Sequence, residues 1–136
     1  MVPIDVTFAS MPGTQAAIGT AGVHSLIADR PVGKAGGKGL GFNGGQLLAL
    51  ALGGCFCNDL QYVADDLGVK LGRIDIQVHL ELDGNPLVAT SAQLTVDLET
   101  ADGNNPDEVI DAARKICTVA NSLAQGMEVT IRSSQS

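Results

Sequence analysis

The sequence predicts one domain that mixes helices with antiparallel strands, and three observations support this prediction. Short β-type runs occupy the first 30 residues, a long apolar helix pattern fills the centre, and a strictly alternating hairpin pattern follows it. A length of 136 residues fits a single compact domain over 1–136, and a 45% share of hydrophobic residues allows a real core. Because only 3% of the residues are aromatic, we expect a core of Leu, Val, Ile and Ala.

The charge of the chain excludes two classes of partner. Fifteen acidic and eight basic residues give a net charge of −7 and a pI near 4.5. This charge repels the phosphate backbone of nucleic acids and anionic lipid surfaces. The N-terminus has no signal-peptide pattern, and the longest fully apolar run, 47–57, is shorter than the roughly 18 residues of a membrane span. We therefore expect a cytoplasmic protein with no nucleic-acid and no membrane partner.

The N-terminal third is predicted to be an antiparallel meander followed by a long loop. Three β-type runs are separated by turn signals: 4–10, 14–20 and 23–29. Residues 31–45 then contain seven glycines, which is too irregular for a helix or a strand interior. The loop lacks the GxxxxGK[ST] pattern of phosphate-binding loops, so we do not assign nucleotide binding to it.

The centre of the chain predicts one long helix. Asn43 offers an N-cap, Gly68 ends the pattern, and the helix between them has about 24 residues. Its first half is apolar on every face, which indicates a place in the centre of the fold or between subunits. Its second half is expected to return toward water through four polar residues: Asp59, Gln61, Asp65 and Asp66.

A hairpin, a second helix and a closing strand are predicted after the long helix. Residues 73–83 and 91–100 alternate apolar with polar positions, which predicts two half-buried paired strands. Asn105 and Pro106 are typical of a helix start, and this helix is expected to run to about Cys117. The last element expected is a strand over 127–132.

The three cysteines are the candidates for chemistry, and an odd count leaves at least one free thiol. On a helix, Cys55 and Cys57 lie about 200° apart, so they cannot bond to each other or share one metal ion without unwinding it. For Cys57 we expect simple packing, because free cysteine is among the most buried residue types. The residues alone leave open whether Cys55 meets Cys117.

Two motifs resemble hallmarks of the OsmC/Ohr family. QLLALALGGC, ending at Cys55, is similar to the family's "ELL-A-LA-C" helix, and CTVANSL, beginning at Cys117, resembles its "CPVSNSL". The approach to the helix is similar too, so the resemblance covers the chain from about His24 to Arg132. It implies an α+β, OsmC-like fold in which two chains intertwine as a homodimer, with antiparallel sheets around long central helices.

The resemblance also implies an activity, the thiol-dependent reduction of organic hydroperoxides in oxidative-stress defence. Cys55 is then the peroxidatic thiol and Cys117 the resolving thiol. A thiolate attacks the peroxide and becomes a sulfenic acid, which the second thiol converts to a disulfide. An external dithiol reductant restores both thiols, and neither a metal nor any other cofactor is implied.

The chain departs from the family pattern at the position that activates the thiol. The peroxidase branch has a glutamate ten residues before the helix cysteine, where it orients an arginine, and here this position is Gly45. Asp59, one turn after Cys55, would raise the thiol pKa if it were close, but we expect it to face polar surroundings. Thr118 replaces the usual proline after the second cysteine. The possible activating or substrate-site residues are Arg30, His24, Lys38 and Gln46.

Three functions therefore stay open, of which the sequence favours a thiol peroxidase. The second is an OsmC-like protein without peroxidase activity that binds a small hydrophobic ligand at the dimer interface. The third is a transferase or hydrolase that uses Cys55 as a nucleophile without redox cycling.

Overall fold

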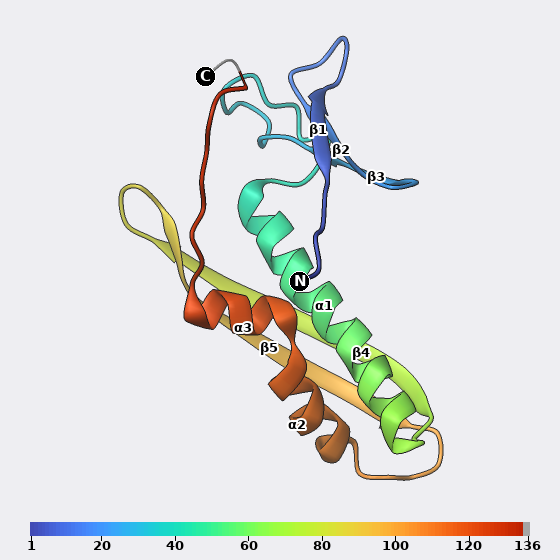
Figure 1. Ribbon diagram of the computed structural model, residues 1–136. Coiled ribbons are helices and arrows are strands. Elements are labelled where there is room, and N and C mark those ends of the chain that lie inside the picture. The colour runs from blue at the N-terminus through green and yellow to red at the C-terminus, as the bar shows by residue number, and fades with distance from the viewer. Residues whose placement is uncertain (135–136) are drawn as a thin grey trace. The chain divides into compact units, whose positions relative to one another are not determined.

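The computed structural model describes residues 1–134, and the chain forms two compact units (Figure 1). The first unit extends from Met1 to Leu48 and the second begins at Ala49. Helix α1, Gly44–Leu67, contributes its first residues to one unit and the rest to the other. The expectation of a single domain over 1–136 stays a prediction.

The first unit contains a three-stranded antiparallel sheet in the order β1-β2-β3, which confirms the predicted meander. The strands are β1 (Thr7–Ser10), β2 (Ala17–Ala21) and β3 (His24–Ala28). Phe8 pairs with Gly19, and a Cβ at Gly19 would lie 2.6 Å from the Phe8 ring. The glycine therefore lets the aromatic ring lie across the neighbouring strand.

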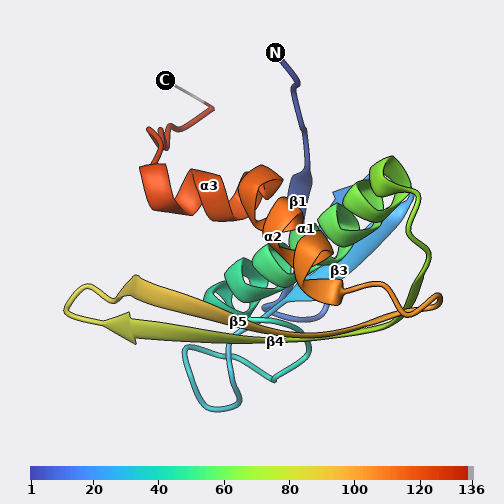
Figure 2. The same ribbon diagram turned by 90° about the horizontal axis from the view of Figure 1, so that it is seen from below.

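The second unit is a long hairpin with helices on one face (Figure 2). Strands β4 (Leu71–Asp83) and β5 (Val88–Thr100) pair antiparallel, as the alternating pattern predicts. Ile74, Ile76 and Val78 on β4 contact the core. Nine buried residues form that core: Leu52, Phe56, Leu60, Val63, Ala64, Leu98, Val109, Ala113 and Cys117.

The ends of α1 follow from its sequence. The Asn43 Oδ1 atom accepts a hydrogen bond from the Gln46 N–H at 2.9 Å, and Gln46 Oε1 accepts one from the Asn43 N–H at 3.0 Å. This reciprocal pair is a capping box, which confirms Asn43 as the N-cap. At the other end Gly68 has a φ of 68°, and the Val69 N–H reaches the Ala64 carbonyl at 2.9 Å. This Schellman arrangement ends the helix where the glycine predicts it.

The first half of α1 is less buried than its composition predicts. Leu50 is 50% exposed, and the buried residues of the helix begin only at Leu52. An apolar helix surface exposed in one chain is typical of an interface between subunits, and the homodimer stays a prediction. By length and composition alone α1 could cross a membrane, but core helices of soluble proteins meet the same test. The burial of Leu60 and Phe56 among other side chains fits a core helix.

The C-terminal part differs from the prediction in two ways. The second helix, α2 (Pro106–Ile116), ends as expected, but α3 (Thr118–Gln125) follows at once and was not predicted. Eight residues are too few for a clear helical period in the sequence. The predicted strand over 127–132 is wrong, because in the described part of the chain these residues join no sheet. Alternation alone does not make a strand without a partner.

Candidate functional site

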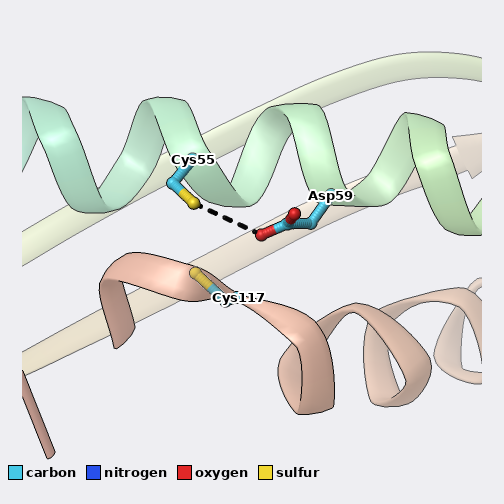
Figure 3. Close-up of side chains that lie close together, drawn as sticks. All are labelled: Cys55, Asp59 and Cys117. Carbon is cyan, nitrogen blue, oxygen red and sulfur yellow. Dashed lines mark hydrogen bonds between the residues drawn. The ribbon is translucent and has the colours of Figure 1, made fainter. Parts of the chain in front are cut away.

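Two thiols and one carboxylate converge in the second unit (Figure 3). Cys55 and Asp59 lie four residues apart on α1, so their side chains leave the same face of the helix. Cys117 reaches them from the junction between α2 and α3. The two sulfur atoms and a carboxylate oxygen all lie within 4.8 Å of one another. We call Cys55, Asp59 and Cys117 the thiol–carboxylate cluster.

The members of the cluster differ in their access to solvent. Cys55 is half-buried, whereas Cys117 is completely buried, with 0% of its surface exposed. The Cys55 thiol donates a hydrogen bond to Asp59 Oδ2 at 3.5 Å. Asp59 is only 7% exposed, so the expectation that it faces polar surroundings is wrong. The reason is that the helix turns the i+4 position onto the same core-facing side as Cys55.

Burial sets the protonation of the second thiol. The pKa of Cys117 is raised from 9.0 to about 11, chiefly by removal from solvent and to a smaller extent by the neighbouring Cys55 and Asp59. The backbone N–H of Ala120, in the first turn of α3, opposes this shift. Cys117 is therefore a neutral thiol at physiological pH, and the more accessible Cys55 is the first sulfur that a reagent meets.

The local sequence explains how Cys117 is held in place. Its φ and ψ of −64° and 107° are not helical, so it separates α2 from α3. The Asn121 N–H donates to the Cys117 carbonyl at 2.9 Å, and Asn121 Nδ2 donates to the Lys115 carbonyl at 3.2 Å. Asn121 thus ties the first turn of α3 to the last turn of α2. Thr118 begins α3 at the position where a proline would also fit.

Close packing of α1 on the hairpin positions Cys55. A Cβ at Gly53 would lie 3.0 Å from Val78 Cγ2, so this glycine allows α1 to pack closely against the Val78 side chain of β4. Cys55 itself packs against the core. Cys57 is half-buried and is not a member of the thiol–carboxylate cluster, which agrees with its place on another face of the helix.

Two candidate activating residues, Arg30 and Lys38, belong to a separate network in the first unit. Asp29 Oδ2 accepts hydrogen bonds from the backbone N–H groups of Leu40 at 2.9 Å and Lys38 at 3.1 Å. Asp29 Oδ1 accepts a hydrogen bond from the Arg30 backbone N–H at 2.8 Å. It also forms an ion pair with Arg30 Nη2 at 3.2 Å. These donors, above all the Leu40 N–H, lower the pKa of Asp29 although burial opposes them. Asp29 therefore organises the glycine-rich loop.

Of the four candidate activating or substrate-site residues, three take part in hydrogen bonds within the first unit, and the fourth, His24, is exposed. Arg30 Nη2 also donates to the Gln15 carbonyl, while its Nε has no hydrogen-bond partner within residues 1–134. Gln46 is engaged in the capping box, and Lys38 enters the Asp29 network through its backbone. His24 is exposed at the start of β3.

The sequence draws attention to all three cluster residues, but it wrongly directs Asp59 toward polar surroundings and so does not count it as part of the site. The spacing of Cys55 and Asp59 was the correct signal, because residues four apart lie on the same face of a helix. Two sulfurs and a carboxylate at this distance can exchange protons, form one disulfide or hold one cation.

Comparisons with solved structures show the same fold in several bacterial proteins. An OsmC-like protein from Mycoplasma pneumoniae is 19% identical, with a TM-score of 0.74 over 90% of this chain and 88% of that one. The organic hydroperoxide resistance protein OsmC from Legionella pneumophila is 18% identical, with a TM-score of 0.63 over 90% of each chain. The organic hydroperoxide resistance protein OhrB of Bacillus subtilis is 25% identical, with a TM-score of 0.58 over 89% of this chain and 90% of that one.

These similarities confirm the α+β class and the OsmC-like fold that the motifs imply. No curated protein matches the chain. The family model described as OsmC-like protein matches residues 36–132, which is most of the sequence and includes the whole thiol–carboxylate cluster. The chain therefore belongs to the OsmC-like protein family, whose members include organic hydroperoxide resistance proteins.

Proposed function

We propose that the protein reduces organic hydroperoxides with Cys55 as the peroxidatic thiol and Cys117 as the resolving thiol. The observation that carries the proposal is the meeting of two sulfurs from distant parts of the sequence, within 4.8 Å of each other. Membership of a family that includes organic hydroperoxide resistance proteins supports it.

The first step takes place at Cys55 because it is the more accessible of the two thiols. Its thiolate attacks the outer oxygen of the hydroperoxide, the O–O bond breaks, and the alcohol leaves after taking up a proton. Cys55 is then a sulfenic acid. Cys55 packs against an apolar core that includes Leu52 and Phe56, and such apolar surroundings favour an organic substrate over a small inorganic one.

The second step joins the two sulfurs. The Cys117 sulfur attacks the sulfenic sulfur, a disulfide forms, and water leaves with the hydroxyl group of Cys55 and the proton of Cys117. A disulfide needs about 2.05 Å between sulfurs, so they must approach by less than about 3 Å. An external dithiol then reduces the bond and restores both thiols.

Activation of Cys55 differs from the family pattern, because Gly45 replaces the glutamate and Arg30 is paired with Asp29. The acceptor beside the thiol is instead Asp59, through the 3.5 Å hydrogen bond. Asp59 can receive the Cys55 proton, but its negative charge also disfavours a thiolate nearby. We therefore expect a slower first step than in a site with a paired arginine.

The test is peroxide turnover with cumene hydroperoxide and a dithiol reductant, in the wild type and three variants. Cys55→Ser should reduce turnover to background. Cys117→Ser should accumulate a sulfenic acid on Cys55 that dimedone traps. Cys57→Ser is the matched control, because this half-buried thiol lies outside the cluster, and it should keep the wild-type rate. Full turnover by Cys55→Ser would refute the proposal.

A second candidate is binding of a small hydrophobic ligand without peroxide turnover. One observation favours it, an apolar hollow of about 250 Å³ on the sheet of the first unit. Its lining includes Val6, Phe8 and Leu26. If the wild type shows no turnover but a Phe8→Ala variant weakens saturable binding of a fluorescent fatty acid, this candidate replaces the first.

A further inference from the structure

We propose that the reduced thiol–carboxylate cluster binds one thiophilic divalent cation, with Zn²⁺ as the best fit. Cys55 and Cys117 would supply two sulfur ligands and Asp59 one oxygen ligand. This proposal does not depend on peroxide turnover, because it concerns the affinity of the reduced protein for a metal.

The distances suit tetrahedral zinc. Ligand bonds of about 2.3 Å for sulfur and 2.0 Å for oxygen place a sulfur and an oxygen ligand about 3.5 Å apart, and two sulfurs about 3.8 Å apart. Cys55 Sγ and Asp59 Oδ2 are 3.5 Å apart. No separation in the cluster exceeds 4.8 Å, so a shift of about 1 Å or less completes the geometry.

The chemistry of the donors selects the metal. Two sulfurs favour soft or borderline cations over Mg²⁺ and Ca²⁺, which prefer sets of oxygen ligands. Three protein ligands leave the fourth tetrahedral position for water, as in open zinc sites. The helix geometry that prevents Cys55 and Cys57 from sharing one metal ion does not apply here, because the second sulfur ligand is Cys117.

The charge around the cluster supports a cation. Asp59 is 7% exposed, and in the part of the chain that the structure describes no Lys, Arg or His forms an ion pair with it. Buried charges in proteins are usually paired or coordinate a metal. On binding, a divalent cation would displace the thiol protons of Cys55 and Cys117, and its two positive charges would balance two of the three negative charges of the ligands.

The ligands lie on or between packed helices, so little free energy is lost in ordering them when a metal ion binds. Cys55 and Asp59 lie within one helix, and Cys117 is fixed between α2 and α3 by the hydrogen bonds of Asn121. Leu60 and Ala113 pack α1 and α2 into the same core. A disulfide between Cys55 and Cys117 would remove both sulfur ligands, so oxidation and metal binding exclude each other.

The experiment titrates Co²⁺ into the full chain, reduced and freed of metal with a chelator, and then displaces it with Zn²⁺. Tetrahedral cobalt–thiolate coordination gives intense visible bands and a charge-transfer band in the near ultraviolet. We expect one Co²⁺ per chain with these bands, and their loss when one equivalent of Zn²⁺ is added.

Variants identify the ligands. Cys55→Ser and Cys117→Ser should each weaken Co²⁺ binding by about 100-fold or more, and Asp59→Asn by about 10-fold to 100-fold. Cys57→Ser should bind as the wild type does, because Cys57 is outside the cluster. Circular dichroism verifies that each variant is folded, and the nearly isosteric Asp59→Asn keeps the test valid if a serine variant does not fold.

Two results would overturn the proposal. One is a reduced wild type that shows no thiolate–cobalt band at one equivalent or binds Co²⁺ only with an octahedral spectrum. The other is a Cys57→Ser variant that loses as much affinity as Cys55→Ser. Neither result bears on the disulfide chemistry, which is measured with peroxide on metal-free protein.

Discussion

Two carboxylates of this chain, Asp29 and Asp59, are equally buried, each 7% exposed, but they have opposite surroundings. Asp29 in the first unit accepts hydrogen bonds from three backbone N–H groups and pairs with Arg30. Asp59 in the second unit lies beside two sulfurs and accepts a hydrogen bond from one thiol. The oxygens of Asp29 are occupied by hydrogen bonds that fix the glycine-rich loop, whereas Asp59 can still accept a proton or bind a cation.

The comparison shows why burial alone does not identify a functional acid. Charge-assisted hydrogen bonds from backbone groups fix Asp29 as an anion and close the glycine-rich loop around it. In this loop Gly37 is buried, and a Cβ there would overlap the Arg30 and Pro31 backbone. Near Asp59 the neighbours are themselves ionisable, and such clusters are typical of functional sites.

The largest expected effect concerns the reactivity of Cys117. With a pKa of about 11 against the ordinary 9.0, its thiolate fraction at pH 8 is about a hundredth of that of an ordinary cysteine. Alkylation by iodoacetamide at pH 8, followed by peptide mapping, should modify Cys117 at least about 100-fold more slowly than a model thiol. In Asp59→Asn the rate at Cys117 should rise, because one cause of the raised pKa is removed. An unchanged alkylation rate at Cys117 would show that Asp59 does not contribute to its raised pKa.

The second largest effect concerns the stability of the protein, which we expect to depend on Asp29 more than on Asp59. Asp29→Ala removes the acceptor of three backbone N–H groups, so thermal unfolding should show a clear drop in Tm. Asp59→Asn removes a buried charge that has no ion pair within residues 1–134, and we expect a change of less than about 1 kcal/mol. A larger destabilisation by Asp59→Asn than by Asp29→Ala would contradict the contrast between the two carboxylates.

A smaller effect is expected at alkaline pH. The folded chain holds the pKa of Cys117 near 11, above the unfolded value of 9.0, so the associated stability is complete below pH 9 and is lost as the pH rises toward 11. The slope is about 1.4 kcal/mol per pH unit while only the unfolded thiol ionises. Urea unfolding between pH 8 and pH 11 should therefore show a steeper loss in the wild type than in Cys117→Ala. Equal slopes would contradict the raised pKa.

The smallest expected effect is at acid pH and belongs to Asp29. Because the folded state lowers the pKa of Asp29 below 3.8, its contribution is present above that value and is lost as the pH falls through the folded pKa. Asp29→Asn should remove this part of the acid sensitivity, as followed by circular dichroism below pH 4. An acid transition that is the same in the wild type and in Asp29→Asn would contradict the lowered pKa of Asp29.

The sequence predicts local features well because they depend on near neighbours. Asn43 and Gly68 mark both ends of α1, and the alternation in 73–83 and 91–100 predicts the hairpin. The convergence of Cys55 with Cys117 was implied only by the family resemblance, since no local rule joins residues so far apart. The strand expected over 127–132 was wrong, because pairing depends on a partner that the pattern does not reveal.

The most direct test of the account treats metal-free, anaerobically reduced protein with one equivalent of cumene hydroperoxide. Intact mass and peptide mapping then follow the cysteines over time. The account predicts rapid loss of two hydrogen atoms and a peptide that links Cys55 to Cys117, with Cys57 still a free thiol. Thiols that survive, or that oxidise only as slowly as an ordinary free cysteine, would contradict it, as would a bond that involves Cys57.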